Sequence, residues 1–236
     1  MKEVDIKDIQ LKLYEKLKPS GWGDKLKSFI LSSDFENILN RLYLESRKGI
    51  HFTPILKQVF RAFEECPYQD LKVVLIGQDP YPQKGVADGI AFSGSNKNET
   101  EASLRYIFNA IAREVYNKEG YKWDPDLKRW SNQGILMLNS ALTTTIAKSG
   151  AHHELCKPFM SFLLDMISIN NPGLIYGFIG AKAKAYEDII PDNSSHKFYV
   201  SHPASAMYNN FDWATNGFFK DIHECCKKNF GYEIIW

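Results

Sequence analysis

Cysteine is scarce in this chain, and its spacing builds neither a metal site nor a disulfide framework. The 236 residues contain four cysteines, at Cys66, Cys156, Cys225 and Cys226. No two of them form a C-x-x-C pair, which excludes the common zinc ribbons and disulfide scaffolds. The spacing also differs from that of iron–sulfur ligands. We therefore expect a reduced protein that uses no metal ion or other cofactor.

Long apolar runs and an excess of charge of either sign are also missing. No stretch approaches the length of a membrane span, and the start of the chain is charged from Lys2 onward, which argues against a secretory signal. The 29 basic and 28 acidic side chains give a formal net charge of +1. An anionic partner must therefore meet a local patch instead of the field of the whole molecule. These absences predict a cytoplasmic protein that makes no membrane contact.

The pattern of apolar residues predicts an α/β fold. With 44% hydrophobic residues the chain can fill one large core, and apolar residues at helical spacing make residues 1–70 helical. Four runs rich in branched and aromatic residues follow, at 73–76, 135–138, 174–179 and 198–200, and helical segments lie at 103–116, 156–169, 181–189 and 215–228. The alternation predicts a three-layer α/β/α fold with a central, mainly parallel four-stranded sheet. We expect one domain over residues 1–236, with its α/β core over about 71–236.

Polar side chains stand directly after the predicted strands. Gln78, Asp79 and Tyr81 follow the first strand, Asn139 follows the second, Gly180 follows the third, and Ser201 and His202 follow the fourth. Because the carboxyl ends of parallel strands share one edge of a sheet, these groups should converge. An acid, an amide, an aromatic ring and an imidazole suit the recognition of a flat polar ligand and acid–base or electrostatic chemistry.

Each of these residues also has a purely structural interpretation. Asp79 precedes a proline and suits a turn, and Asn139 suits a turn cap. His202 also precedes a proline, which favours an extended loop. Their common position after the strands is what favours a site.

Several short motifs around these residues follow one another in a fixed order. They are Gly77-Gln-Asp-Pro-Tyr81, Gly89-Ile-Ala-Phe-Ser93, Gly134-Ile-Leu-Met-Leu-Asn139 followed by Ala141-Leu-Thr143, then Gly180-Ala181, Ser201-His-Pro203 and the closing Ile234-Ile-Trp236. In content, order and spacing they resemble the motifs of the family 1 uracil-DNA glycosylases, and they cover most of the chain. The resemblance implies a monofunctional, metal-independent enzyme that extrudes uracil from DNA and hydrolyses its N-glycosidic bond. An abasic site would remain and start base excision repair.

The resemblance implies two catalytic residues. Asp79 would orient or deprotonate the attacking water and stabilise the cationic sugar as the bond breaks. His202, as a neutral imidazole, would donate a hydrogen bond to uracil O2 while negative charge develops on the leaving base.

The resemblance also implies four uracil-binding residues. Asn139 would pair with N3–H and O4 of uracil and exclude cytosine, which presents the opposite pattern. Tyr81 would block the C5 position and exclude thymine through a steric clash. Phe92 would stack on the extruded base, although plain core packing would also place a phenylalanine there. The backbone of Gln78 would face the uracil and the neighbouring phosphate.

A further set of residues is expected to contact DNA. Hydroxyls and backbone amides of Ser93, Ser103 and Ser201 are candidate phosphate ligands. His152 matches a family histidine near the DNA backbone, with a solvated loop residue as the alternative. The loop after His202 would contribute Ala204, Ser205, Met207 and Tyr208.

Three departures from the family pattern stand out. Pro82 replaces the histidine that usually follows the motif tyrosine, and the loop over 96–103 lacks the usual prolines. The loop after His202 is several residues shorter, and Ala206 takes the place of the leucine that wedges into the duplex. Alanine is too small for that task, so Met207 or Tyr208 would have to insert. If neither inserts, the enzyme should prefer single-stranded DNA, where extrusion costs less.

Two other classes of function stay open at this point. A metal-dependent hydrolase would place Asp79, His152, His153 and His202 around an ion, although no ligand pair such as H-E-x-x-H is present. A non-catalytic DNA-binding module of a replication complex would use the same fold without the chemistry. The expected partners are uracil-containing DNA, single- or double-stranded, and a proteinaceous inhibitor that mimics DNA. The chain is expected to act as a monomer.

Overall fold

A parallel sheet of four strands forms the centre of the molecule. The computed structural model describes residues 5–94, 100–119, 123–192, 195–209 and 212–236. The sheet has the order β3-β2-β5-β6 and consists of β2 (Val73–Gly77), β3 (Ile135–Asn139), β5 (Ile175–Ile179) and β6 (His196–Val200). Each neighbouring pair runs parallel. The predicted α/β fold is confirmed, and this sheet is parallel throughout.

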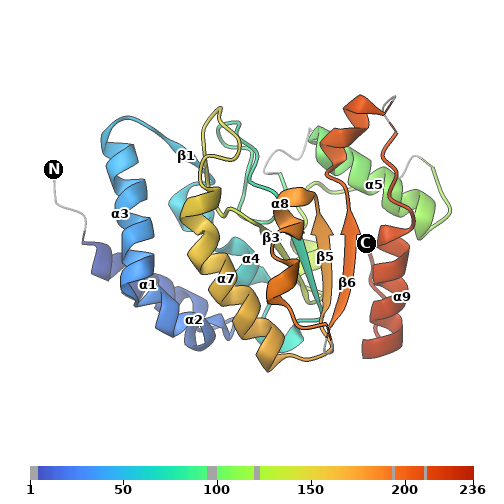
Figure 1. The fold of residues 1–236 in the computed structure, drawn as a ribbon, viewed down its shortest axis with the longest axis horizontal. Coiled ribbons are helices and arrows are strands. Elements are labelled where there is room, and N and C mark those ends of the chain that lie inside the picture. The colour runs from blue at the N-terminus through green and yellow to red at the C-terminus, as the bar shows by residue number, and fades with distance from the viewer. Residues whose placement is uncertain (1–4, 95–99, 120–122, 193–194, 210–211) are drawn as a thin grey trace.

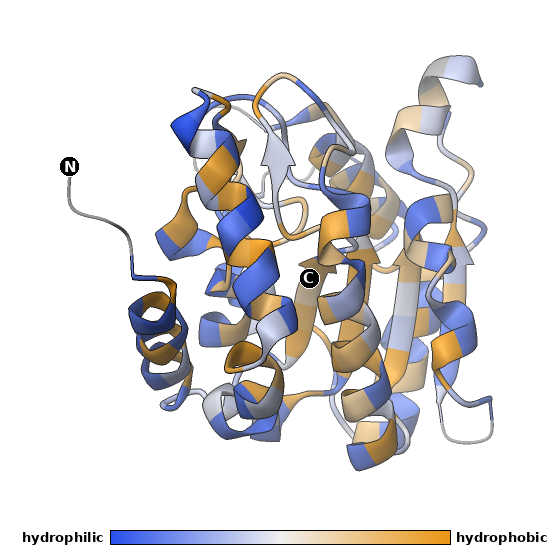
Figure 2. Ribbon diagram, turned by 60° about the vertical axis from the view of Figure 1, so that its left-hand side comes forward, coloured by the Kyte–Doolittle hydropathy of each residue, from blue (hydrophilic) through white to orange (hydrophobic). Residues whose placement is uncertain are grey.

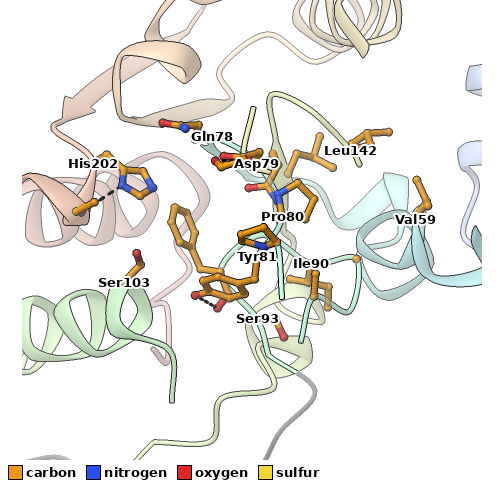
Figure 3. Close-up of a pocket in the computed structure, with 18 residues that line it drawn as sticks. Val59, Gln78, Asp79, Pro80, Tyr81, Ile90, Ser93, Ser103, Leu142 and His202 are labelled. Atoms are coloured by element: carbon orange, nitrogen blue, oxygen red, sulfur yellow. Dashed lines mark hydrogen bonds between the residues drawn. The ribbon is translucent and has the colours of Figure 1, made fainter. Parts of the chain in front are cut away.

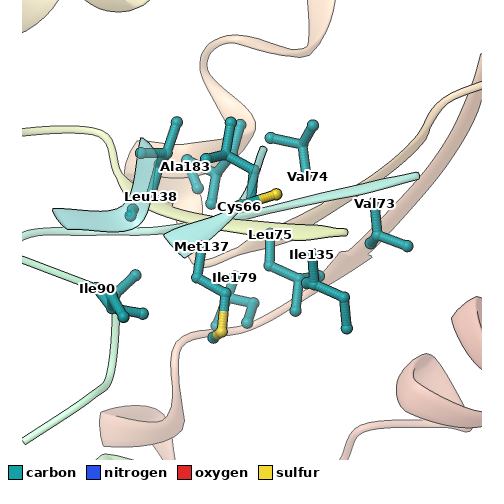
Figure 4. Packing of buried hydrophobic residues seen from close by; sticks show 14 of the residues in the cluster. Cys66, Val73, Val74, Leu75, Ile90, Ile135, Met137, Leu138, Ile179 and Ala183 are labelled. Atoms are coloured by element: carbon teal, nitrogen blue, oxygen red, sulfur yellow. The ribbon is translucent and has the colours of Figure 1, made fainter. Parts of the chain in front are cut away.

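The burial of the strands explains why their sequences are continuous apolar runs. Every residue of β2 and β5 is buried, and β3 is buried up to Asn139. Strands covered on both faces need apolar side chains in both directions. The edge strand β6 is partly exposed and correspondingly more polar. Figure 4 shows Val73 and Leu75 of β2 beside Ile135 and Met137 of β3 in the common core.

The helices surround this sheet. The first three, α1 (Ile6–Leu17), α2 (Trp22–Ile30) and α3 (Ser33–Arg47), gather at one end of the molecule, where α2 and α3 contact α7 (His153–Asn170) (Figure 1). At the other end α9 (Phe218–Phe230) packs on β5 and β6, and α5 (Ala102–Glu114) contacts α9. The short helices are α4 (Arg61–Glu65), α6 (Lys128–Ser131) and α8 (Ala181–Lys184). Hydrophilic and hydrophobic residues alternate along the helices, whereas the strands are largely hydrophobic (Figure 2). No helix of the described ranges is both long and apolar enough to span a bilayer.

Two segments differ from the sequence-based prediction. Residues 5–70 are mostly helical, but β1 (Phe52–Thr53) pairs antiparallel with β4 (Thr144–Thr145). A strand of two residues is too short to show an alternating pattern. The helix predicted over 181–189 is split into α8 and the 3₁₀ helix η3 (Glu187–Ile189). Ala183 of α8 and Tyr186, which directly precedes η3, are both buried. Their spacing in the sequence is also that of the buried face of one continuous helix, which explains the prediction.

Candidate active site

A cavity of about 270 Å³ lies at the carboxyl ends of the central strands (Figure 3). Segments after β2, β3 and β6 all contribute to its wall, so the predicted convergence at one sheet edge is observed. Nine of the residues predicted from the sequence line it: Gln78, Asp79, Tyr81, Phe92, Ser93, Ser103, Asn139, His202 and Ala204. Leu142 and Ser149 also line the cavity and were not predicted.

Gly77 leaves room for two side chains in this wall. It ends β2 directly opposite Asn139 of β3. A Cβ atom at Gly77 would lie 2.7 Å from Asn139 Oδ1 and 2.8 Å from the Phe92 ring. The missing side chain therefore lets the Asn139 amide and the Phe92 ring approach each other at the strand end.

Two hydrogen bonds from the loop between β4 and α7 hold the Asp79 carboxylate. The Ser149 hydroxyl donates to Asp79 Oδ2 at 2.6 Å, and the Gly150 N–H donates to the same oxygen at 2.7 Å. Neither Ser149 nor Gly150 belongs to a motif of the sequence, which contained no signal for this contact. Asp79 is thus an oriented carboxylate at the end of a buried strand.

His202 lines the cavity, and its surroundings favour the neutral ring with its proton on one particular nitrogen. The Ala204 N–H donates to His202 Nδ1 at 3.2 Å, so Nδ1 is the acceptor and the proton of the neutral ring is on Nε2. Burial lowers the pKa of His202 from its usual 6.5, and the Asp79 carboxylate opposes this shift only in part. A neutral imidazole with a donating Nε2–H results.

A hydrogen bond joins Tyr81 to the backbone of Phe92, and both residues line the cavity. Phe92 has a positive φ of 62°, and the Tyr81 hydroxyl donates to its carbonyl at 3.0 Å. The Phe92 ring centroid lies 6.1 Å from that of His202. The Tyr81 hydroxyl stays protonated because burial raises its pKa. Phe92 is mostly buried, yet it borders the cavity instead of only filling the core.

Comparison with known proteins identifies the family of this chain. A family model described as the uracil DNA glycosylase superfamily matches residues 63–224. The chain belongs to this superfamily. A uracil-DNA glycosylase of Borrelia turicatae is 32% identical over 205 residues, which are 86% of this chain and 88% of that protein.

Two solved structures share the fold. The crystal structure of mimivirus uracil-DNA glycosylase is 24% identical, with a TM-score of 0.83, and the match covers 94% of this chain and 88% of that one. A tyrosine-to-leucine variant of mimivirus UNG in complex with UGI is 25% identical, with a TM-score of 0.82 over 93% of this chain and 90% of that one.

A buried ion network supports the Gly89–Ser93 segment of this glycosylase-superfamily site. Asp88 is 2% exposed and accepts from Arg61 Nη1 at 2.6 Å, while Arg61 Nη2 binds Asp126 at 2.8 Å. Asp88 also accepts from the Ile90 N–H and the Ser93 hydroxyl. The one signal in the sequence was an acid inside an otherwise apolar stretch, and its partner could not be read from it.

Ser93 therefore differs from its predicted role. Its hydroxyl donates to Asp88 at 2.6 Å and accepts from the Leu127 N–H at 3.2 Å. These bonds direct the hydroxyl into the protein, so it is not placed as a phosphate ligand. Its backbone N–H is also used, because it donates to the Ile90 carbonyl.

His152 is neither a DNA-facing residue nor a solvated one. It is 2% exposed, and its Nδ1 lies 2.9 Å from Thr143 Oγ1 and its Nε2 3.0 Å from Glu45 Oε2. Burial acts to raise the pKa of Glu45, but hydrogen bonds from Arg41 and His152 outweigh it and lower that pKa. His152 thus ties the loop before α7 to α3, a contact that its position in the sequence could not reveal.

The segment after His202 forms the 3₁₀ helix η4 (Pro203–Tyr208), which contacts α5. Ala206 is completely buried, whereas Tyr208 is 91% exposed. Ser201 and Ser205 lie outside the cavity lining, with their hydroxyls 3.1 Å apart. The side chain of Met207 lies outside the described part of the chain. The same holds for residues 95–99, in the loop before α5 that lacks the usual prolines.

Of the four residues in the metal-site alternative, Asp79 lies near enough to His153 and His202 for its charge to act on both rings, but His152 is held elsewhere. His152 turns its ring nitrogens to Thr143 and Glu45, and His153 Nδ1 lies 3.3 Å from Ser140 Oγ. Within the described ranges, no three His, Cys, Asp or Glu side chains form a group that would hold an ion.

Proposed function

We infer that this protein excises uracil from DNA by hydrolysing the N-glycosidic bond, as a monofunctional and metal-independent member of family 1 of its superfamily. The observation that carries the inference is the single cavity lined by Asp79, Asn139, Phe92 and His202. An oriented carboxylate, a neutral imidazole donor, an amide at the cavity wall and an aromatic ring are the groups that this reaction requires. Free uracil and an abasic site are the products.

Two residues carry the chemistry in this proposal. As the C1′–N1 bond breaks, positive charge develops on the sugar, and the Asp79 carboxylate stabilises it. Asp79 also orients the water that attacks C1′ and accepts the proton that this water loses. The electron pair of the broken bond stays on uracil. His202 Nε2–H donates to O2 of the leaving base, which requires the neutral ring that the bond from Ala204 N–H supports.

Selectivity follows from the shape and polarity of the cavity wall. Asn139 supplies an acceptor for N3–H and a donor for O4, so cytosine would meet two mismatched groups. Phe92 stacks on the base and Tyr81 leaves no room for the C5 methyl group of thymine. The hydrogen bond between Tyr81 and the Phe92 carbonyl keeps these two rings in fixed positions. The carbonyl of Gln78 accepts from Ser140 and Ala141, which holds the backbone beside the base.

The shortened loop after His202 uses Tyr208 as its wedge. Ala206 is too small and completely buried, whereas Tyr208 presents almost its whole side chain to solvent at the end of η4. An exposed ring can fill the gap left by an extruded base and stack on its neighbours. The hydroxyl of Ser103 on α5 and those of Ser201 and Ser205 in the segment of η4 would bind the phosphates. The N–H groups of Ala204 and Ser205 both donate to His202, so these two amides are not placed as phosphate ligands.

Substitution of the wedge tests this assignment. Tyr208→Ala should slow excision from duplex DNA by about tenfold or more and leave single-stranded substrate nearly unaffected, because extrusion from a duplex costs a few kcal/mol. Met207→Ala is the matched control for this pair of candidates. An equal effect on both substrates, or a larger effect of Met207→Ala, would refute the role of Tyr208.

The whole chain is proposed to act as one domain and as a monomer on single- or double-stranded DNA. Mimivirus UNG has been solved in complex with UGI. A protein inhibitor that mimics DNA is accordingly expected to cover the same cavity and η4 here. Co-migration of this chain with such an inhibitor in size-exclusion chromatography, with loss of activity, would support the shared face.

One assay tests the proposed function directly. A labelled oligonucleotide carrying one uracil, single-stranded or paired with G or A, is incubated with the protein in a chelator and then treated with alkali. Cleavage at uracil and not at thymine is expected, with loss of activity in Asp79→Asn. DNA binding without cleavage would refute the enzyme and favour a non-catalytic DNA-binding module.

A further inference from the structure

The Asp79 carboxylate is held asymmetrically. The Ser149 hydroxyl and the Gly150 N–H both donate to Oδ2, at 2.6 and 2.7 Å. The shorter distance is typical of a charge-assisted bond from a hydroxyl to a carboxylate. In the described part of the chain, the donors to this carboxylate all bind Oδ2, and none binds Oδ1.

We propose that Ser149 is a positioning residue for Asp79, which fixes the carboxylate so that Oδ1 meets the attacking water and the sugar. The inference rests on the proposed function and deepens it by adding a residue that no motif contains. A carboxylate at the end of a strand can rotate about its side-chain bonds. A second anchor on one oxygen restricts that rotation before substrate binds.

The loop that carries Ser149 is itself fastened to the catalytic segment. The Ala147 N–H donates to the Pro82 carbonyl at 2.9 Å, three residues beyond Asp79. The Thr144 hydroxyl donates to the Lys148 carbonyl at 2.8 Å. The pairing of β1 with β4 holds the start of the same loop. These contacts fix the position of Ser149 relative to Asp79.

The residue after Tyr81 cannot donate a hydrogen bond to Asp79 in place of Ser149. Pro82 follows Tyr81 in the chain and has neither a side-chain donor nor an N–H. Ser149 is solvent-exposed, so its hydroxyl contributes little to the core. Its effect on Asp79 should be separable from any effect on folding.

Single-turnover excision of uracil, with enzyme in saturating excess, tests the proposal. Ser149→Ala should slow the reaction about tenfold, because one charge-assisted hydrogen bond to the reacting carboxylate is lost. Ser149→Thr keeps the hydroxyl and should restore most of the rate. The decisive readout is the Asp79→Asn background, in which Ser149→Ala should have little further effect because the charged partner is gone.

The control is Lys148→Ala, the preceding exposed residue of the same loop, which should retain the wild-type rate at saturation. Thermal denaturation should give similar midpoints for all four loop forms. A rate for Ser149→Ala within twofold of an active wild type would overturn the proposal, as would an equal slowing in the Asp79→Asn background. A wild-type chain that does not excise uracil would refute the proposed function itself, and the positioning role with it.

Discussion

Adding one methyl group at Gly77 should disable the site while leaving the fold intact. In Gly77→Ala the new Cβ would lie 2.7 Å from Asn139 Oδ1 and 2.8 Å from Phe92 Cε2, whereas ordinary contacts begin near 3.4 Å. Both neighbouring atoms are the far ends of side chains, and they must move by about 0.7 Å and about 0.6 Å, respectively. The displacement therefore falls on the two groups proposed to read and stack the base.

The magnitude of the loss follows from this displacement. Catalytic groups tolerate errors of about 0.5 Å, and a misplacement of about 1 Å costs about a hundredfold in rate. We expect excision by Gly77→Ala to fall by about 10- to 100-fold. The free energy of unfolding should fall by only about 1–2 kcal/mol, since the side-chain ends give way before the backbone does.

The assay combines single-turnover excision with urea denaturation. Gly94→Ala is the matched control, because a Cβ at Gly94 meets no atom of the described residues within 4 Å, and it should keep both the rate and the stability of the wild type. A Gly77→Ala protein with wild-type excision would refute the reasoning. So would a variant that loses activity only in proportion to its loss of folded protein.

Three further predictions concern the groups around the cavity. Burial lowers the pKa of His202 in the folded protein, so below pH about 6.5 the unfolded chain binds a proton that the folded one does not, and stability should fall as the pH drops. His202→Gln should flatten this part of the curve of Tm against pH. An unchanged curve would contradict the assignment. Glu45→Ala removes a hydrogen-bond partner of the buried His152 ring and should lower the free energy of unfolding in urea by about 1–3 kcal/mol. The control Arg41→Ala removes an exposed partner of Glu45 and should lower it by less than about 0.5 kcal/mol. Equal losses of stability would rule out the buried contact as the cause. Arg61→Ala leaves the Asp88 carboxylate buried without its cation and should cost about 3–5 kcal/mol; a thermal midpoint within a degree or two of wild type would disprove this.

The position of the cavity was predictable because it depends on local pattern. A continuous apolar run predicts a buried parallel strand, and whatever follows that run must emerge at the carboxyl edge of the sheet. Asn139 ends its strand, Asp79 and His202 come two residues after theirs, and all three therefore meet at the cavity. The order of such residues along the chain was enough to indicate the family.

Contacts between side chains from distant segments were not predictable. Ser93 was expected to bind phosphate, but its hydroxyl binds Asp88 instead. His152 was expected near DNA, yet it pairs with Glu45, 107 positions away. Neither partner is marked by a motif, since a serine or histidine in a loop has the same local pattern whether it faces solvent or the interior.

The sequence by itself determined the sheet, the edge at which its polar residues gather, and the absence of a wedge-sized side chain at Ala206. Period and position along a strand decide these features, and both can be read from neighbouring residues. Only the tertiary structure decided which oxygen of Asp79 is held by Ser149, 70 positions away, and which nitrogen of His202 bears its proton. A hydrogen bond depends on a few tenths of an ångström between groups that the chain brings together only when the whole core has packed.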